Sequence, residues 1–364
     1  MTRSLWIDAA GLPRTIDQTL LPFETRQISL DSPLACAEAI RGMQVRGAPL
    51  IGAVGAYGLA LALRADPGDA ALEAAFAELL ATRPTAVNLR WALERVRARI
   101  AGLAPAQRAA VAWAECAALC DEDVACNRAI GAHAARLLLA AREADGERPI
   151  NVLTHCNAGR LATIDEGTAL AAVYRLQRDG VPVHVWVDET RPRNQGSGLT
   201  TWELAQRGVP HTVIADNAGG LLMQRGQVDA VIVGCDRVAA NGDVANKIGT
   251  YLKALAARDA DVPFFVACPV SSVDSRTPDG AAVEIEHRDP REITHVRGFD
   301  DEAGAPGVLR IVPEGTAALN PGFDVTPARL VTALVTEKGV VSASREGIAA
   351  LLADAGGIAD TGRS

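Results

Sequence analysis

The fold is indicated most clearly by the stretch Ala230-Val231-Ile232-Val233-Gly234-Cys235-Asp236. Its first four residues form a continuous apolar run, which predicts a buried strand, and a carboxylate follows soon after. The stretch Asn151-Val152-Leu153-Thr154-His155-Cys156 repeats this arrangement with a thiol. In open α/β sheets, ligands bind outside the carboxyl ends of the strands. We therefore expect Asp236 and Cys156 to face a site in which they form a candidate acid/base pair.

Similar short apolar runs alternate with helical stretches along the C-terminal part of the chain. Strands are expected at residues 151–154, 183–187, 212–214, 230–233, 264–267 and 309–312. Helices are expected between them, near residues 168–178, 199–207, 219–224 and 248–258. This alternation predicts an α/β fold with parallel strands and crossover helices.

The N-terminal part has a mainly helical pattern after a short strand-like start. Asp31 and Ser32 before Pro33 provide a cap and a first turn for one helix, and Pro49 opens the next. Further helices are expected at 86–100 and 105–142, the second of which has room for one break. A change of pattern near Asp145 divides the chain into a helical domain, 1–145, and a parallel-sheet domain, 146–364. Residues 270–307 are polar and weakly patterned, which predicts a lid or a surface excursion.

Composition excludes several classes of protein. The chain has 364 residues, 49% of them hydrophobic, so it can bury a large core without disulfides. Its formal net charge of -8 argues against a general nucleic-acid binder. Seven cysteines fit no paired framework, and the N-terminus lacks the apolar core of a signal peptide. The apolar stretch 49–63 is short for a membrane span and carries glycines, so we expect a buried helix in a cytoplasmic protein.

Two groups of residues that resemble ligand motifs are better explained by packing. The cysteines of segment 116–126 share one predicted helix, and His133 lies too far beyond them to share a metal ion. The glycines of segment 52–58 are spaced by three inside a helix, which is not a dinucleotide fingerprint. We therefore expect no metal and no cofactor.

Several polar residues stand at turns where a helix begins. Arg46 precedes Gly47 and Ala48 at such a turn, and an arginine beside a helix N-terminus suits a phosphate. Arg83 and the pair Asn246-Lys247 occupy similar junctions. Each alone fits a surface ion pair or a solvated side chain equally well. Together, in an acidic chain, they indicate a site for an anionic small molecule.

Other candidates also have two interpretations. Gln195 follows the strand at 183–187 and offers hydrogen bonds to a sugar hydroxyl, the alternative being a solvated loop. Asp236 equally fits a turn cap or a partner of Arg237. Cys156 equally fits an apolar filler. His155 should point to the opposite side of an extended chain from Cys156, so adjacency does not imply a Cys–His dyad.

Together these motifs resemble the family that contains the methylthioribose-1-phosphate isomerases and the regulatory subunits of translation initiation factor 2B. The matching segments are Arg46-Gly47-Ala48-Pro49, Arg83 to Leu89, Thr154 to Gly159, Glu189 to Pro192 with Gln195-Gly196, Asp236-Arg237, Asn241 to Asp243, Asn246 to Thr250 and Phe323 to Pro327. They extend over most of the chain, and in combination they are highly specific.

The resemblance implies a helical N-terminal domain, a C-terminal Rossmann-like domain, and a homodimer. It implies an aldose–ketose isomerase of methionine salvage that acts on 5-methylthioribose 1-phosphate. Asp236 is then the proton donor, and Cys156 stabilises the transition state. The implied substrate contacts are Arg46, Gly47, Ala48, Arg83, Gln195, Asn246 and Lys247.

Three other functions remain open at this point. Gly198 stands where many members of the family carry an arginine, which bears on the group at C5 of the sugar. The alternatives are therefore an isomerase of 5-deoxyribose 1-phosphate or of ribose 1,5-bisphosphate. The third is a non-catalytic regulatory protein similar to the initiation-factor subunits, which has no need of both Cys156 and Asp236.

Overall fold

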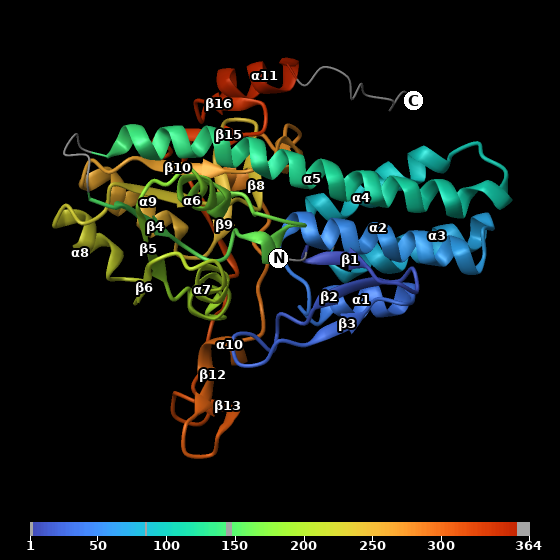
Figure 1. Ribbon diagram of the computed structural model, residues 1–364, viewed down its shortest axis with the longest axis horizontal. Helices are drawn as coiled ribbons and strands as arrows, with labels where there is room; N and C mark the ends of the chain where they lie inside the picture. Colours follow the sequence, from blue (N-terminus) through green and yellow to red (C-terminus); the bar gives the residue numbers. More distant parts are fainter. Residues whose placement is uncertain (1–2, 84–85, 143–147, 355–364) are drawn as a thin grey trace.

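The computed structural model describes residues 3–83, 86–142 and 148–354. A helical N-terminal part is followed by a seven-stranded, mostly parallel sheet with helices on both faces (Figure 1). The predicted fold class is therefore confirmed. The predicted domain boundary near Asp145 falls in 143–147, outside the described residues.

The N-terminal part combines a small antiparallel sheet with five helices. The strands are β1 (Leu5–Ile7), β2 (Pro13–Ile16) and β3 (Gln27–Ser29), and the helices are α1 (Pro33–Arg41), α2 (Ala48–Ala65), α3 (Asp69–Thr82), α4 (Val87–Ile100) and α5 (Pro105–Ala141). Of Asp31 and Ser32, it is Ser32 that caps α1, because its Oγ accepts a hydrogen bond from the Ala35 N–H at 3.1 Å. The predicted break in α5 is wrong, since one helix of 37 residues runs through the segment.

Helix α2 is the centre of the helical core. Among the described residues, α2 is one helix that is long and apolar enough to cross a membrane. Yet 78% of its 18-residue span is buried inside the protein. It packs against α1, α3, α4 and α5, which bury residues 50–63 completely or nearly so. The expectation of a buried helix at this position is confirmed.

Helix α5 connects the helical core to the sheet (Figure 1). Its first half contributes Leu119 and Val124 to the core around α2. Its second half contributes Ile130 and Leu138 to a second core, which it shares with α6 and one face of the sheet. The two parts of the chain are therefore joined by a continuous helix and two packed cores.

The main sheet has the strand order β16-β15-β10-β7-β4-β5-β6. Its strands are β4 (Ile150–Thr154), β5 (Val183–Asp188), β6 (His211–Ile214), β7 (Ala230–Val233), β10 (Phe264–Ala267), β15 (Ala333–Thr336) and β16 (Gly339–Val341). All neighbours pair in parallel except β15 and β16. The chain winds from β4 to β6 in one direction and from β7 to β15 in the other. The order therefore reverses between β4 and β7. The crevice at the carboxyl ends of these two strands is the switch point of a doubly wound sheet.

Helices cover both faces of this sheet. They are α6 (Ala169–Arg178), α7 (Thr201–Gln206), α8 (Gly219–Gln224), α9 (Thr250–Asp259) and α11 (Arg345–Asp354). Val152 and Ile232 point into the core that contains α5 and α6, whereas Leu153 and Val231 point into the core that contains α9. Successive strand residues alternate between faces, so continuous apolar runs are needed to fill both cores.

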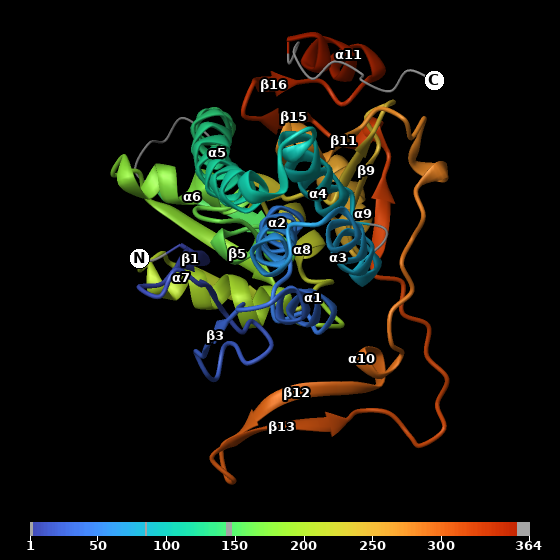
Figure 2. The ribbon, with the colours of Figure 1, turned by 90° about the vertical axis from the view of Figure 1, so that its right-hand side faces the viewer.

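One predicted strand is wrong. Residues 309–312 overlap β13 (Ala305–Arg310), which pairs only with β12 (His295–Asp300) in an arm that stands away from the body (Figure 2). The last parallel strand of the sheet is β15, which is buried against β10. Leu309 is 67% exposed, so its apolar run does not fill a core.

A second, four-stranded sheet lies beside the crevice in the order β11-β8-β9-β14. Its strands are β8 (Arg237–Ala239), β9 (Val244–Lys247), β11 (Val273–Asp274) and β14 (Phe323–Thr326). The segment 270–307 is a surface excursion that includes β11, the short helix α10 (Arg291–Thr294) and the β12 strand of the arm. Part of it returns to the crevice between β4 and β7, as described below.

Candidate active site

A cavity opens at the switch point, between the carboxyl ends of β4 and β7 and the start of α2. It is lined by every residue that the sequence predicts for the site: Cys156, Asp236, Arg46, Gly47, Ala48, Arg83, Gln195, Asn246 and Lys247. These residues come from both parts of the chain. The structure therefore brings them together, and their chemical roles stay predictions.

Cys156 is held in an unusual backbone conformation directly after β4. Its φ of 66° lies in the left-handed region, which a residue with a side chain adopts only when its surroundings enforce it. Its N–H donates to Thr190 Oγ1 at 2.8 Å, and its carbonyl accepts from Thr200 Oγ1 at 2.7 Å. The loop thus fixes the thiol at the cavity wall.

His155 makes contacts away from the thiol. Its Nδ1 lies 2.9 Å from Asp188 Oδ2, and its Nε2 lies 2.8 Å from the Ile248 carbonyl oxygen. Both ring nitrogens are therefore used in fixing β4 against β5 and the loop before α9. The structure contains no Cys156–His155 hydrogen bond among the described residues, in line with the alternation expected for an extended chain.

His155, Asp188 and Asp216 also lie close enough together to hold a metal ion by distance alone. A cation from the protein already lies there, since Lys253 Nζ is 3.3 Å from Asp188 Oδ2 and donates to the Asp216 carbonyl. A metal ion would have to displace this buried ammonium. The group therefore fits a structural charge cluster better than a metal centre.

Asp236 follows β7 and faces the positive groups of the cavity. Burial raises the pKa of its carboxyl, and the charges of Lys247, Arg83 and Arg46 partly oppose this rise. The neighbouring Arg237 lies 3.4 Å from Asp274. A carboxyl with a raised pKa keeps its proton at higher pH than a free aspartic acid, so Asp236 is suited to donate one.

Arg46 is oriented by the loop that follows Cys156. It donates from Nη1 to Asn157 Oδ1 at 2.6 Å and from Nη2 to the Asn157 carbonyl at 2.8 Å. Gly47 has a φ of 92°, and a methyl group there would lie 2.4 Å from the Ala162 backbone. Only glycine allows this approach, which sets the start of α2 at the cavity. A helix N-terminus beside an arginine is a favourable place for an anion.

Lys247 lies between the two predicted catalytic residues. Its Nζ donates to the Gly322 carbonyl at 2.8 Å and lies 4.2 Å from the centre of the Phe323 ring. Burial lowers the pKa of Lys247, whereas the nearby Cys156 and Asp236 raise it. Any negative charge at Cys156 or Asp236 therefore strengthens the protonated form of this lysine.

The other predicted contacts complete the wall. Arg83 pairs with Glu286 at 2.9 Å, and its neighbours 84 and 85 lie outside the described residues. Asn246 donates from Nδ2 to Thr250 Oγ1 at 3.1 Å. Gln195 is 5% exposed, and its Oε1 has no hydrogen-bond partner among the described residues. This orphaned acceptor fits a hydroxyl of a bound sugar.

Arg288 and Ser272 are among the lining residues that the sequence analysis did not predict. Arg288 contacts Glu286 at 3.2 Å and Glu292 at 3.1 Å, and it adds a cation to the cavity. Ser272 is fully buried, and its Oγ has no partner among the described residues. Both lie in the weakly patterned segment 270–307, where no local signal marks them.

Comparisons with known proteins agree on one family. The model of the initiation factor 2 subunit family matches residues 44–343. Methylthioribose-1-phosphate isomerase of Acidiphilium cryptum is 57% identical over 355 residues, which cover 97% of this chain and 96% of that protein. The enzyme of the same name from Gluconobacter oxydans is 57% identical over 353 residues, or 96% of each chain.

Solved structures give the same result. Crystalline 5-methylthioribose 1-phosphate isomerase from Pyrococcus horikoshii OT3 matches with a TM-score of 0.85 and 37% identity, covering 97% of this chain and 96% of that one. Translation initiation factor eIF-2B subunit delta from A. fulgidus matches with a TM-score of 0.78 and 40% identity, covering 94% and 96%. The chain therefore belongs to the initiation factor 2 subunit family.

Proposed function

We propose that this protein is an aldose–ketose isomerase that converts 5-methylthioribose 1-phosphate into 5-methylthioribulose 1-phosphate, a reaction of methionine salvage. One observation carries the proposal. Cys156 and Asp236 follow β4 and β7, on the two sides of the switch point, and line a cavity with Arg46, Arg83 and Lys247. The names of relatives that match nearly the whole chain support the same reaction.

The positive groups of the cavity support a position for the C1 phosphate. Arg46, Lys247, Arg83 and Arg288 line the same cavity as the first residues of α2. Arginine forks and backbone N–H groups at a helix start are the usual ligands of a phosphate. The reacting sugar carbons then lie between the phosphate and the catalytic pair.

The phosphate at C1 prevents simple opening of the sugar ring to an aldehyde. In our mechanism, the Asp236 carboxyl donates its proton to the ring oxygen while the bond from that oxygen to C1 breaks. The hydrogen on C2 moves to C1, and the C2 hydroxyl returns a proton to the Asp236 carboxylate. The product is a ketose 1-phosphate, and the enzyme regains its starting protonation state.

Two routes transfer the hydrogen from C2 to C1. In a proton route, Cys156 acts as a base that removes the C2 proton, which leaves an enol across C1 and C2. Cys156 then returns a proton to C1 as the C2 hydroxyl gives up its own. In a hydride route, the hydrogen moves with its electron pair, and Cys156 stabilises the charge that develops. Solvent deuterium at C1 of the product would rule out a strictly direct hydride shift.

The surroundings of the cavity favour an apolar group at C5. A neighbouring hollow shares Met43, Arg46 and Gln195 with the cavity. Leu21 and Leu199 form part of its wall. A methylthio group fits this environment better than a second phosphate does.

Ketose formation from three sugars, followed by NMR, tests the proposal. The sugars are methylthioribose 1-phosphate, 5-deoxyribose 1-phosphate and ribose 1,5-bisphosphate. We expect the highest kcat/KM for the methylthio sugar. A preference for either other sugar would overturn the assignment at C5. No turnover by folded protein would favour a regulatory role instead.

The remaining expectations also form part of the proposal: a cytoplasmic homodimer that needs no metal, cofactor, nucleic acid or membrane. Exposed apolar residues on the β12–β13 arm support an association, since Val308 is 61% and Leu309 67% exposed. Light scattering during gel filtration should give twice the mass of one 38.0 kDa chain. A monomer would contradict this part of the proposal.

A further inference from the structure

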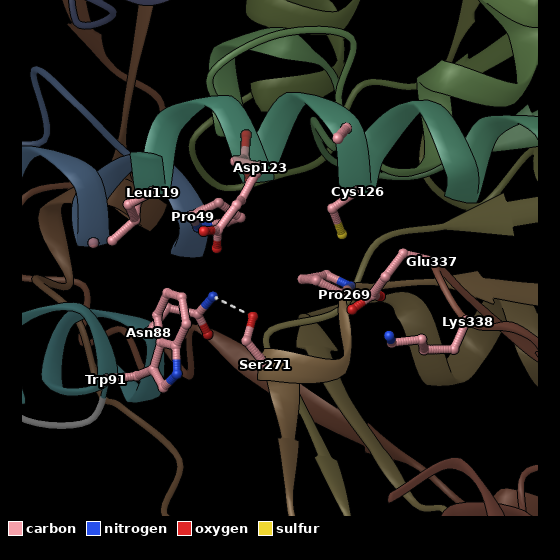
Figure 3. Close-up of a pocket in the computed structure, with 13 residues that line it drawn as sticks. Pro49, Asn88, Trp91, Leu119, Asp123, Cys126, Pro269, Ser271, Glu337 and Lys338 are labelled. Carbon is pink, nitrogen blue, oxygen red and sulfur yellow. Dashed lines mark hydrogen bonds between the residues drawn. The ribbon is translucent and has the colours of Figure 1, made fainter. Parts of the chain in front are cut away.

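A second cavity lies beside the catalytic one and shares Pro49 and Pro269 with it. It is formed by residues of α2, α4 and α5 and by the loops that follow β10 and β15 (Figure 3). Its volume is about 450 Å³. Most of its wall is apolar, with Trp91 and Leu119 among the lining side chains. These dimensions suit a small organic molecule.

Two hydrogen-bond acceptors in this cavity lack a donor. Asp123 Oδ2 accepts from the Ile164 N–H at 2.8 Å and from Asn127 Nδ2 at 2.9 Å. For Asp123 Oδ1 there is no hydrogen bond from the described residues, and Figure 3 shows the carboxylate pointing into the cavity. Asn88 is 2% exposed, and its Oδ1 has no partner among the described residues.

Asn88 Oδ1 is buried without a donor, which costs on the order of 1–3 kcal/mol, so a ligand that brings a donor to this atom gains most of this energy. The Asn88 amide nitrogen is already used, since it donates to Ser271 Oγ at 3.4 Å (Figure 3). The side-chain carbonyl oxygen of Asn88 and Oδ1 of Asp123 can therefore both accept hydrogen bonds from N–H or O–H groups of a ligand.

The charges around the cavity favour a positive ligand. The acids that line it are Glu122, Asp123 and Glu337, against a single lysine, Lys338. Glu122 is neutralised by Arg95, which contacts it at 2.5 Å and 2.8 Å. Glu337 accepts from the Val270 N–H at 3.0 Å. Asp123 has no cationic partner among the described lining residues. Trp91 lines the same cavity, and the Arg95 guanidinium lies 5.5 Å from the centre of its ring.

We propose that this cavity binds a small primary amine that carries an aromatic or aliphatic body, at a site separate from the catalytic cavity. The ammonium group donates to Asp123 and Asn88, and the body packs against Trp91, Leu119 and Cys126. The proposal rests on the second cavity alone, and binding can be measured whether or not the protein is an isomerase.

The shared residues connect the two cavities. Pro49 is the second residue of α2, whose start carries Gly47 and follows Arg46. Asp123 also holds Ile164, two residues after the Ala162 backbone against which Gly47 packs. A bound amine therefore restrains the start of α2 through Pro49 and the segment from Ala162 to Ile164 through Asp123. We therefore expect saturating amine to change KM for the sugar phosphate at least about twofold.

Three probes with the same ring and chain length test the chemistry: phenethylamine, 2-phenylethanol and phenylacetate. Isothermal titration calorimetry with the full chain is done at about pH 8, because burial raises the pKa of Asp123 to about 7. We expect the amine to bind about tenfold more tightly than the alcohol, and the acid not to bind. Equal binding of the three, or no binding of the amine, would overturn the proposal.

Variants locate the site. Asp123→Asn keeps an acceptor for Ile164 and removes the charge, so amine affinity should fall about tenfold while alcohol affinity stays the same. Asp121→Asn on the exposed side of α5 is the matched control and should change neither. Trp91→Leu gives a second test if Asp123→Asn folds poorly. Amine affinity that survives both substitutions places binding elsewhere, and binding without a change in KM refutes the connection.

Discussion

Replacing Gly47 by alanine tests the contact that brings Arg46 and the start of α2 to the catalytic cavity. Gly47 has a φ of 92°, and the added methyl group would lie 2.4 Å from the Cα and the carbonyl oxygen of Ala162. The left-handed conformation costs about 1–2 kcal/mol, and overpacking costs about 1–3 kcal/mol. We expect Gly47→Ala to lower the free energy of unfolding by about 3 kcal/mol.

Gly102→Ala is the matched control for this substitution. Gly102 has a φ of 74°, but no atom lies within 4 Å of the position that a methyl group would take. Only the conformational part, about 1–2 kcal/mol, is then lost. An unfolding entropy of about 2.1 cal/mol/K per residue predicts that Tm falls by about 4 °C for Gly47→Ala and about 2 °C for Gly102→Ala.

The two variants should differ more in kcat/KM than in Tm. To relieve the contact with Ala162, Gly47→Ala must move the start of α2 and with it Arg46. Misplacement of a binding group by about 1 Å costs on the order of 100-fold in rate. We expect a loss of about this size in kcat/KM for Gly47→Ala, measured by NMR, and almost none for Gly102→Ala. Equal effects of the two substitutions on Tm and kcat/KM would refute the reasoning.

Arg288→Ala removes one cation near the proposed phosphate position, so KM should rise about tenfold, or about 1.4 kcal/mol, with little change in kcat. Steady-state kinetics measures this, and an unchanged KM removes Arg288 from the site. Because burial raises the pKa of Asp236, kcat/KM should be highest below that raised pKa and fall as pH rises through it. A pH profile that only rises would contradict the donor role. Asp188→Ala leaves the Lys253 ammonium buried without its carboxylate, which should lower the free energy of unfolding by about 3–5 kcal/mol in urea. A loss below about 1 kcal/mol would show that Lys253 has sufficient other partners.

Continuous apolar runs identified most strands of the main sheet. The runs at 230–233 and 264–267 match β7 and β10 residue for residue, because strands covered on both faces must be apolar throughout. The same criterion failed at 309–312. That segment, Leu309-Arg310-Ile311-Val312, is interrupted by an arginine, and so short a segment does not reveal which strand it pairs with. The sixth strand of the main sheet lies at 333–336 instead.

The catalytic cavity was predictable in part for a similar reason. Cys156 and Asp236 follow recognisable strands, and parallel strands end at the same edge of a sheet. Arg288 and Ser272 reach the cavity from an irregular segment, so their approach depends on contacts far away in the sequence. The second cavity has no sequence signature at all, since Asn88, Asp123 and Glu337 meet there from three distant segments.

The central claim is that Asp236 supplies the proton that opens the sugar ring. The most direct measurement compares the wild-type protein with Asp236→Asn, which keeps the shape of the side chain and lacks the acid. Binding of methylthioribose 1-phosphate is measured by calorimetry, and its conversion to the ketose is followed by NMR. The account predicts sugar affinity similar to wild type and a rate that is lower by about 100-fold or more. Ketose formation at the wild-type rate by a folded Asp236→Asn protein would contradict it.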